Sequence, residues 1–422
     1  MRIVSLPARQ SIQRLLGEHL KKRPGLWLFI SMMLVNAGNY GFNVLVGRWL
    51  GPSAYAEINL MITLFLIATF ITSGLQMSAA RAIVGSNNQA ILTMLRRVAW
   101  VCGGLSLLGL GLFAAFWQTL FHTASASPFI ILGVGLACYY ALGVERGIAQ
   151  GCAHFGRLAW NFQIEMAVRL MGACVFVGLG MGVAGATIAL SSSIVIAWLD
   201  SRRSYATVEQ HRTNNSIQLQ MMLPIIIHLL GQVLINNSDV LLVKAWFPAM
   251  IAGQYAALAL IGRVVFFATA TLGTILFPRV LRSTQHSEQQ RLFWQSIMIT
   301  VAIAGLITLL CKIIPQLILG WLFGEAYLPI ADFLWLYAVA TSCYAIANIS
   351  ITYQLAQDRS FGAWIALLAG SIQIGVMSWF NQSIHQILYS QVGVMLGLLL
   401  VLMLYEFYRA RARQKFSKSR VI

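Results

Sequence analysis

Long apolar runs separated by short polar links fill the chain from about residue 26 to residue 406. A helix that crosses the hydrocarbon core of a bilayer needs about 20 mostly apolar residues. Twelve stretches are long and apolar enough, and we expect membrane-spanning helices at 26–46, 55–74, 98–120, 128–148, 159–179, 182–199, 220–243, 253–277, 293–318, 330–354, 361–380 and 386–406. The pattern therefore predicts an all-α integral membrane protein.

The turn between the predicted fifth and sixth spans depends on three glycines. Gly178, Gly180 and Gly182 alternate with apolar residues in the middle of an otherwise continuous apolar stretch. Clustered glycines mark tight turns, so the stretch is divided into two spans there.

Two segments of the chain resemble each other. Residues 45–49 read Leu-Val-Gly-Arg-Trp and are followed by a turn containing Pro52, whereas residues 242–246 read Leu-Val-Lys-Ala-Trp and are followed by Pro248. A Tyr-Ala pair then opens the next span in each copy, at Tyr55 and at Tyr255. Six predicted spans separate the copies, and an even number preserves orientation. The repeat predicts two six-helix halves related by an axis along the membrane normal. Trp, Tyr and Pro also recur at membrane interfaces for general reasons, which is the alternative explanation of the likeness.

The composition supports an environment of lipid. Hydrophobic residues make up 59% of the chain and charged residues only 10%, whereas soluble proteins carry about 25% charged residues. The six cysteines fall within or beside apolar runs without paired spacing. They are interpreted as small core residues, and neither a disulfide nor a metal site is predicted.

Basic residues lie on one side of the predicted membrane. Of the 29 lysines and arginines, 24 lie in the amino-terminal segment, in the links after spans two, four, six, eight and ten, or in the tail. Their positions are 2, 9, 14, 21–23, 81, 96, 97, 146, 157, 202, 203, 212, 279, 282, 291, 359, 409, 411, 413, 415, 418 and 420. The positive-inside rule makes this face cytoplasmic. We therefore expect a multi-pass membrane protein with both termini in the cytoplasm.

A long polar link divides the chain in two. We expect a first bundle over 1–199, a cytoplasmic linker over 200–219, a second bundle over 220–406 and a basic cytoplasmic tail over 407–422. The opposite face has only short connections, so no external domain is predicted to hold an active site.

The net charge of +17 is explained by basic residues that set the topology and attract anionic lipid headgroups, so no nucleic-acid partner is expected. No glycine-rich loop ending in Lys-Ser or Lys-Thr is present, so the nucleotide-binding motif of that type is missing. No cofactor is predicted, and any driven transport would use a coupling ion, a proton or sodium, or the membrane potential.

Several short runs together resemble a known family. The most informative is Val46-Gly47-Arg48-Trp49-Leu50-Gly51-Pro52, which is similar to the glycine-arginine-x-leucine-glycine-proline pattern that ends the first helix of polysaccharide transporters. Further similar runs, in family order, are Arg146-Gly147 with Gln150-Gly151 and Phe155-Gly156-Arg157, Asn237 to Val243 with Ala252 to Tyr255, Phe277-Pro278, and Leu322 to Glu325 with Tyr327. The ordered set resembles the polysaccharide-transport branch of the multidrug/oligosaccharidyl-lipid/polysaccharide exporter superfamily. One departure is that Lys244-Ala245 stand in the second half where Gly47-Arg48 stand in the first.

The resemblance implies a flippase of the bacterial cytoplasmic (inner) membrane with a MATE-like fold, in which two six-helix bundles face a central cavity. Such proteins move lipid-linked oligosaccharides, for example O-antigen units of lipopolysaccharide, across the cell inner membrane during polysaccharide biosynthesis. The implied partners are the lipid-linked substrate, membrane lipids and other membrane proteins of polysaccharide assembly.

Charged residues inside predicted spans are the candidate site. Such charges are costly in a bilayer and usually face a cavity or a partner. The candidate cations for binding a substrate pyrophosphate are Arg263, Arg48, Arg169, Lys244 and Lys312, and the candidate ion carriers are Glu165, Asp239 and Glu57. Arginine can hold phosphate oxygens with two parallel hydrogen bonds, whereas lysine acts as a point charge. No catalytic residue is predicted.

Each candidate also has a structural explanation. Glu165 and Arg169 are four residues apart and can neutralise each other on one helix. Arg48, Lys244 and Lys312 can extend to the outer interface, and Asp239 can offset Lys244. Arg263 has no acidic residue within one turn of its own helix, so it is the strongest substrate-binding candidate.

Three functions are weighed. The leading hypothesis is a flippase that translocates a polyprenyl-pyrophosphate-linked oligosaccharide by alternating access. A small-molecule cation antiporter of the MATE type would favour carboxylates in the cavity, whereas this interior holds as many arginines as acids. A membrane-embedded enzyme of polysaccharide assembly would need a large outer loop or a clustered catalytic set, and the sequence shows neither, so the protein is not expected to be an enzyme.

Overall fold

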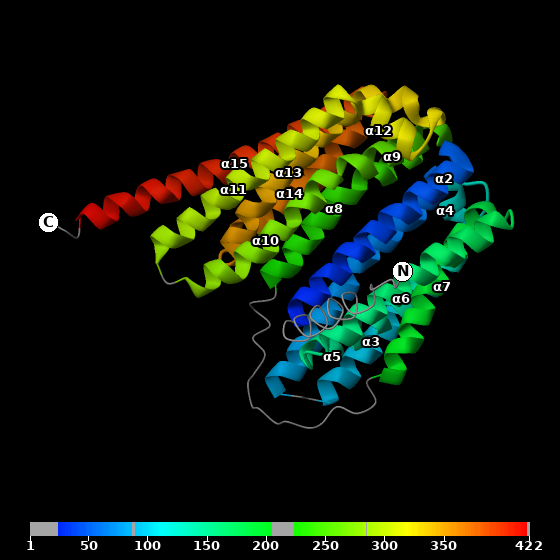
Figure 1. The fold of residues 1–422 in the computed structure, drawn as a ribbon, viewed down its shortest axis with the longest axis horizontal. Coiled ribbons are helices and arrows are strands. Elements are labelled where there is room, and N and C mark those ends of the chain that lie inside the picture. The colour runs from blue at the N-terminus through cyan, green and yellow to red at the C-terminus, as the bar shows by residue number, and fades with distance from the viewer. Residues whose placement is uncertain (1–23, 87–88, 205–222, 284, 420–422) are drawn as a thin grey trace, which may run out of the picture. The chain divides into compact units, whose positions relative to one another are not determined.

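The structure, a computed structural model, describes residues 24–86, 89–204, 223–283 and 285–419. Every regular element in these ranges is a helix, as Figure 1 shows. The all-α prediction is confirmed. The basic residues at positions 2–23, together with Arg212 and Arg420, lie outside the described ranges.

The first half of the chain forms six described helices. They are α2 (Pro24–Ser86), α3 (Gln89–Gly111), α4 (Ala114–Phe121), α5 (Ser127–Gly151), α6 (Phe155–Gly178) and α7 (Gly182–Ser204). The turn between α6 and α7 contains Gly180 and Gly182, both with positive φ, at +81° and +54°. The predicted split of the apolar stretch at these glycines is therefore confirmed.

Helix α2 contains both of the first two predicted spans. Its 63 residues are interrupted at Gly51, where φ is 75° and ψ is 173°. This conformation is almost restricted to glycine, and Pro52 fits the first position of the following helix because it has no N–H to leave unpaired there. The two residues therefore separate two crossings within what is otherwise one helical run.

The second half forms the remaining elements. They are α8 (Leu223–Trp246), α9 (Ala249–Gly262), α10 (Val264–Arg282), α11 (His286–Ile313), α12 (Pro315–Leu322), the 3-10 helix η2 (Glu325–Phe333), α13 (Leu334–Leu355), α14 (Phe361–Trp379) and α15 (Ile384–Ser419). Predicted spans 253–277 and 293–318 are each broken in two, at Arg263 and at Ile314.

The helices are long and apolar enough for a multi-pass membrane protein. In the described part of the chain, ten helical stretches qualify as membrane spans, and the first of them, Ser31–Val84, is long enough for two crossings. Helix α6 is missing from the ten, and it contains the charged residues Glu165 and Arg169. With α6 and the second crossing of α2 included, each of the twelve predicted spans corresponds to helix.

The chain divides into two compact units that interleave in sequence. Unit 1 contains residues 1–46, 71–118 and 124–217, and unit 2 contains residues 47–70, 119–123 and 218–422. The two units thus follow the sequence order except that residues 47–70 and 119–123 of the first half group with the second half. The reason is local: residues beside the break at Gly51 contact α9 and the α12–η2 region, and His122, just after α4, accepts a hydrogen bond from Lys244 of α8.

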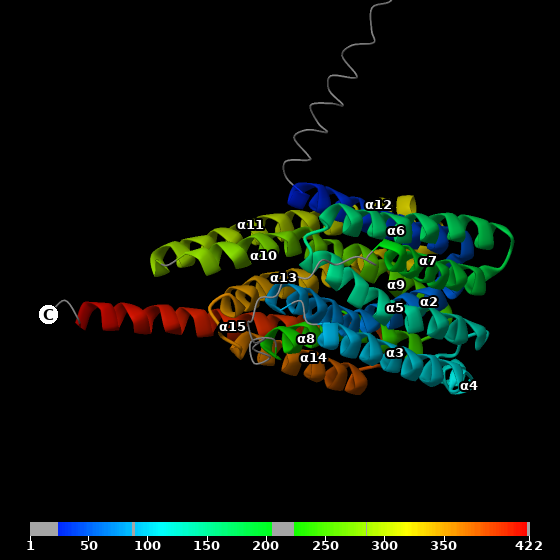
Figure 2. The same ribbon diagram turned by 90° about the horizontal axis from the view of Figure 1, so that it is seen from below.

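Unit 1 is held together by close approaches between helices. Helix α6 lies beside α7, and α5 packs against both α3 and α7, which can be followed in Figures 1 and 2. A Cβ added at Gly103 would lie 2.6 Å from the carbonyl oxygen of Ala137, and one at Gly147 would lie 2.2 Å from that of Gln76. Small residues permit such approaches in membrane proteins, where packing replaces the hydrophobic effect as the driving force.

Unit 2 is built around α13. This helix packs against α10, α11 and α15, while α14 pairs with α8. Its core contains the small residues Ala340, Ala347, Ala366 and Ala369 between aromatic and branched side chains. A second core, around Phe293 and Tyr353, fills the space between α10, α11 and α13.

Candidate functional site

The first buried charge cluster lies in unit 1 and is centred on Glu165 of α6. We call Arg146, Asn161, Glu165 and Arg169 the α6 cluster. The Arg146 guanidinium donates to Glu165 Oε2 at 2.7 Å, and Arg169 donates to Glu165 Oε1 from one turn further along the helix. All four side chains are buried. The predicted ion pair between Glu165 and Arg169 is confirmed, but Glu165 also serves a second arginine.

Further polar side chains extend the α6 cluster to α2 and α7. Arg146 Nε donates to Asn161 Oδ1 at 2.8 Å, and Asn161 Nδ2 donates to Asp200 Oδ2 of α7 at 2.9 Å. Arg169 donates to Asn39 Oδ1 of α2 at 2.8 Å. The network thus joins α2, α5, α6 and α7, and two arginines are balanced by Glu165 directly and by Asp200 through Asn161.

Arg146 is a buried helical residue instead of a link residue. It was placed in the link after the fourth span, but it lies inside α5 with its side chain 5% exposed, and its guanidinium also covers the Phe162 ring at 4.0 Å. Position 146 is within the predicted span 128–148. Its place inside a predicted span was therefore the sequence signal that could have identified Arg146 as a buried charge.

The second buried charge cluster lies in unit 2, around Asp239 of α8. We call Asp239, Tyr255, Arg263 and Tyr337 the α8 cluster. Arg263 Nη2 donates to Asp239 Oδ1 at 2.9 Å. Tyr337 Oη donates to Asp239 Oδ2 at 2.8 Å and accepts a hydrogen bond from Arg263 Nε at 3.0 Å. Tyr255 Oη also donates to Asp239 Oδ2, at 3.1 Å.

This arrangement changes the interpretation of Arg263. Its own helix offers no acidic partner, but α8 does, so its charge is balanced without a substrate. Asp239 was expected to offset Lys244, and instead it is completely buried against Arg263 and two tyrosines. Arg263 also occupies the break between α9 and α10. The cluster therefore holds three elements of unit 2 at this break.

Lys244 is the most deeply buried of the candidate cations. Only 2% of the residue is exposed, which contradicts the expectation that its side chain could extend to the interface. Its ammonium donates to the carbonyl oxygen of His122 at 3.3 Å. Glu57, which is also buried, supplies the opposite charge that acts on it.

Arg48 and Lys312 occupy exposed positions. The Arg48 guanidinium donates to the carbonyl oxygen of Trp321 at 3.0 Å. The Lys312 ammonium lies 4.4 Å from the centre of the Trp335 ring. Lysine over an aromatic ring near a helix end is typical of a membrane interface. Because Lys312 is exposed, it is not grouped with the buried cations.

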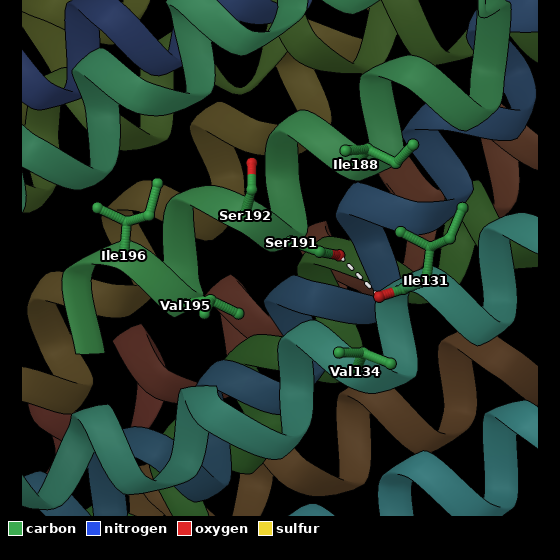
Figure 3. A pocket seen from close by; sticks show the side chains of 7 residues that line it. All are labelled: Ile131, Val134, Ile188, Ser191, Ser192, Val195 and Ile196. Carbon is green, nitrogen blue, oxygen red and sulfur yellow. Dashed lines mark hydrogen bonds between the residues drawn. The ribbon is translucent and has the colours of Figure 1, made fainter. Parts of the chain in front are cut away.

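An apolar groove lies between α5 and α7 in unit 1, as shown in Figure 3. Its volume is about 340 Å³, and it is lined by Ile131, Val134, Ile188, Ser191, Ser192, Val195 and Ile196. Ser191 Oγ donates to the carbonyl oxygen of Ile131 at 2.9 Å, and Ser192 Oγ donates to that of Ala189 at 3.2 Å. None of the predicted site residues lines this groove.

The two copies of the sequence repeat have similar burial. Tyr55 and Tyr255 are both completely buried, and Val46 and Val243 are nearly so, whereas Trp49 and Trp246 are 53% and 37% exposed. Sequence reasoning missed Tyr255 and Tyr337 as partners of a charge. The repeat marks Tyr255 as the counterpart of Tyr55, but its contact with Asp239 depends on packing between helices.

The buried charges give the protein polar groups that can change partners within a bilayer. In the described residues, no group of three or more His, Cys, Asp or Glu side chains is arranged to hold a metal ion. Arginine forks and carboxylates can bind anions or exchange protons, and each arginine of the two clusters already has an internal anion. Binding of a further anion would therefore be an exchange of partners.

Comparisons with solved structures identify the fold. The chain is similar to the lipid II flippase MurJ in an inward closed conformation, with a TM-score of 0.71 and 12% identity over 92% of this chain and 88% of that one. It is also similar to a multidrug resistance MATE family transporter of the MOP superfamily in an inward-facing conformation, with a TM-score of 0.68 and 15% identity over 93% and 99% of the two chains. No protein-family model matches the sequence, and a search of curated proteins finds no match. The protein therefore has the MATE-like transporter fold, and its solved structural neighbours are transporters and flippases.

Proposed function

We propose that this protein is a flippase that moves a polyprenyl-pyrophosphate-linked oligosaccharide from the cytoplasmic to the outer leaflet of the bacterial inner membrane by alternating access. The observation that carries the proposal is a fold shared with a lipid II flippase over 92% of the chain, combined with sequence runs that resemble polysaccharide transporters in the same order. The cytoplasmic location of both termini and the inner membrane are part of the proposal, and they rest on the distribution of basic residues.

The buried arginines supply the chemistry for a diphosphate. Arg169 and Arg263 each have a fork that can hold two phosphate oxygens, and each is engaged by a carboxylate, Glu165 or Asp239. In the proposed cycle the diphosphate replaces the carboxylate on at least one of them. Arg146 joins the candidates because it shares Glu165 with Arg169.

The coupling ion is proposed to act through a carboxylate that loses its arginine. Glu165 or Asp239 would bind a proton or sodium when the substrate anion takes the guanidinium. Glu57 is the third candidate, and it acts on Lys244. Lys312 is assigned no part in diphosphate binding because it lies exposed over Trp335.

A small-molecule cation antiporter is the second candidate function. The likeness to MATE family transporters favours it. A cationic substrate would need a carboxylate, and both Glu165 and Asp239 are occupied by arginines in this structure. A polysaccharide-assembly enzyme receives no support from structural neighbours that are transporters and flippases.

Deletion of the gene in the source organism separates these functions. The flippase proposal predicts loss of a surface glycan and accumulation of its lipid-linked precursor, and a plasmid copy should restore both. An antiporter would leave the glycan unchanged and raise sensitivity to organic cations. Arg291→Ala, at an exposed position of α11, is a matched control for substitutions of buried arginines and should complement fully at normal abundance.

A further inference from the structure

The apolar groove of unit 1 lies where α5 and α7 approach each other closely. A Cβ added at Gly135 of α5 would lie 2.8 Å from Ser191 Oγ of α7. The hydroxyls of Ser191 and Ser192 both donate to backbone carbonyl oxygens, as Figure 3 shows for Ser191. The other five lining residues, Ile131, Val134, Ile188, Val195 and Ile196, are branched and apolar. The groove therefore offers an apolar lining in which the serine hydroxyls are already satisfied.

The groove continues along α7 as a stripe that ends in a charge. Ile188, Ser192 and Val195 line the groove and are four and three residues apart, which is the spacing of one helix face. The same spacing next reaches Leu199 and then Arg202, and both are exposed. One face of α7 thus leads from the apolar groove to a guanidinium at the end of the helix.

The depth of the groove corresponds to one leaflet of a bilayer. At 1.5 Å per residue, Ile196 is about 9 Å and Ile188 about 21 Å from Arg202 along the axis of α7. A bilayer with its headgroups is about 40–45 Å thick, so headgroups and midplane are about 20 Å apart. With Arg202 among the headgroups, the groove extends through the acyl chains to the midplane. The proposed topology makes this the cytoplasmic leaflet.

Arg202 is supported by aromatic rings. Its guanidinium lies 4.8 Å from the centre of the Trp198 ring, and Trp198 meets Trp100 of α3 edge to face, with ring centres 5.5 Å apart. Tryptophan is enriched at membrane interfaces. A guanidinium on an aromatic face keeps the donors that bind phosphate. Among the described residues no carboxylate forms an ion pair with Arg202, whereas Arg96, one turn from Trp100, pairs with Glu145.

We propose that the groove and Arg202 together bind an anionic phospholipid of the cytoplasmic leaflet, with an acyl chain in the groove and the phosphate at Arg202. The charge at one end of an apolar groove matches a lipid with a net negative headgroup. An apolar helix of a second copy would offer that charge no partner. The groove ends near the midplane, which matches an acyl chain one leaflet long. The proposal concerns the lipid-facing side of unit 1 and does not depend on what is transported.

Photochemical labelling tests the site. The purified protein would be placed in phosphatidylcholine vesicles that contain a small fraction of phosphatidylglycerol with a diazirine in its acyl chain. After irradiation, mass spectrometry should find label concentrated at 131–134 and 188–196. Added unlabelled phosphatidylglycerol should suppress this label, and the same amount of added phosphatidylcholine should not.

Two substitutions with matched controls separate the headgroup from the acyl chain. Arg202→Gln removes the charge and Ser192→Phe fills the groove, and each should lower the labelling about tenfold, as loss of a charged hydrogen-bond donor does. Arg291→Gln, at an exposed position of α11, is the control for the charge. Ser371→Phe is the control for the groove, because Ser371 of α14 is exposed and also donates to its own helix, at the Leu367 carbonyl oxygen. Both controls should label as the unchanged protein does.

Four results would overturn the proposal. They are labelling spread evenly over the lipid-facing helices, labelling unchanged by Arg202→Gln, labelling unchanged by Ser192→Phe, and a groove without label, as expected if a second copy covers it. Suppression by a polyprenyl diphosphate at lower concentrations than by phosphatidylglycerol would assign the groove to the substrate chain instead of a phospholipid. Melting temperatures of the variants in detergent show that any loss of label occurs in folded protein.

Discussion

At the scale of single residues, the pairing of Arg263 with Asp239 decides what a substitution can show. Asp239 is completely buried, and Arg263 is its one ion-pair partner among the described residues. Removing the guanidinium leaves a buried carboxylate with only the tyrosine hydroxyls of Tyr255 and Tyr337. Loss of one member of a buried pair typically costs about 3–5 kcal/mol.

We therefore predict that Arg263→Ala lowers both translocation and the amount of folded protein in the membrane. Arg263→Met with Asp239→Leu should recover abundance and thermal stability, because replacing both partners with apolar residues is often neutral. Membrane abundance, the melting temperature in detergent and surface-glycan complementation check these outcomes.

The double variant separates the two roles of Arg263. If it is stable but does not translocate, Arg263 acts on the substrate. Full complementation by the double variant would limit the pair to a structural role and contradict the proposed diphosphate exchange at this residue. Normal abundance of Arg263→Ala alone would show that the carboxylate is not left in an apolar environment.

Residue-level prediction from sequence succeeded where partners share a helix. The spacing of Glu165 and Arg169 was enough to predict their ion pair. The contacts of Arg146 with Glu165 and of Arg263 with Asp239 join residues 19 and 24 apart on different helices. Helix rotation and packing determine such contacts, and the spacing along one helix contains no information about them.

At the scale of elements, the hydrophobic length of each segment predicted the helices because a bilayer demands about 20 apolar residues per crossing. The breaks were harder to predict. The one at Gly51-Pro52 has a chemical signal, whereas those at Arg263 and Ile314 occur within apolar runs. Their positions depend on packing, for example on the hydrogen bonds that Arg263 makes to α8 and α13.

The α2 break gives a prediction with an internal control. Gly51→Ala adds a Cβ into open space but forces alanine into φ 75° and ψ 173°, which costs about 1–3 kcal/mol. Gly74→Ala, on the same helix and also in open space, should be neutral or stabilise by up to about 1 kcal/mol. Melting temperatures of the two purified variants should therefore shift in opposite directions or by clearly different amounts. Equal shifts would show that the Gly51 conformation is not required.

At the scale of the whole molecule, the count of spans and the distribution of basic residues predict the topology together. Reporter fusions at residues 210 and 415 should give cytoplasmic signals, and a fusion near residue 325 should give an external one. A cytoplasmic signal at 325 would contradict the twelve-span topology.

The sequence repeat predicted two bundles, and the repeat gave no sign that residues 47–70 and 119–123 of the first half belong to unit 2. Residues 47–70 leave the first half and pack on the second through Pro52, Tyr55 and Gly253. Packing between helices determines contacts of this kind, and a sequence repeat does not encode it. Superposition of residues 1–200 on 220–406 with Trp49 near Trp246 stays a prediction for an experimental structure.

The most direct test of the central claim is translocation by the purified protein. Vesicles containing the protein would be loaded with a fluorescent polyprenyl-pyrophosphate oligosaccharide in both leaflets, and a membrane-impermeant reagent would modify the label in the outer leaflet only. Rapid flipping predicts that nearly all of the label becomes modified, against about half in protein-free vesicles. A plateau at half with folded protein present, at several ion gradients and membrane potentials, would contradict the account.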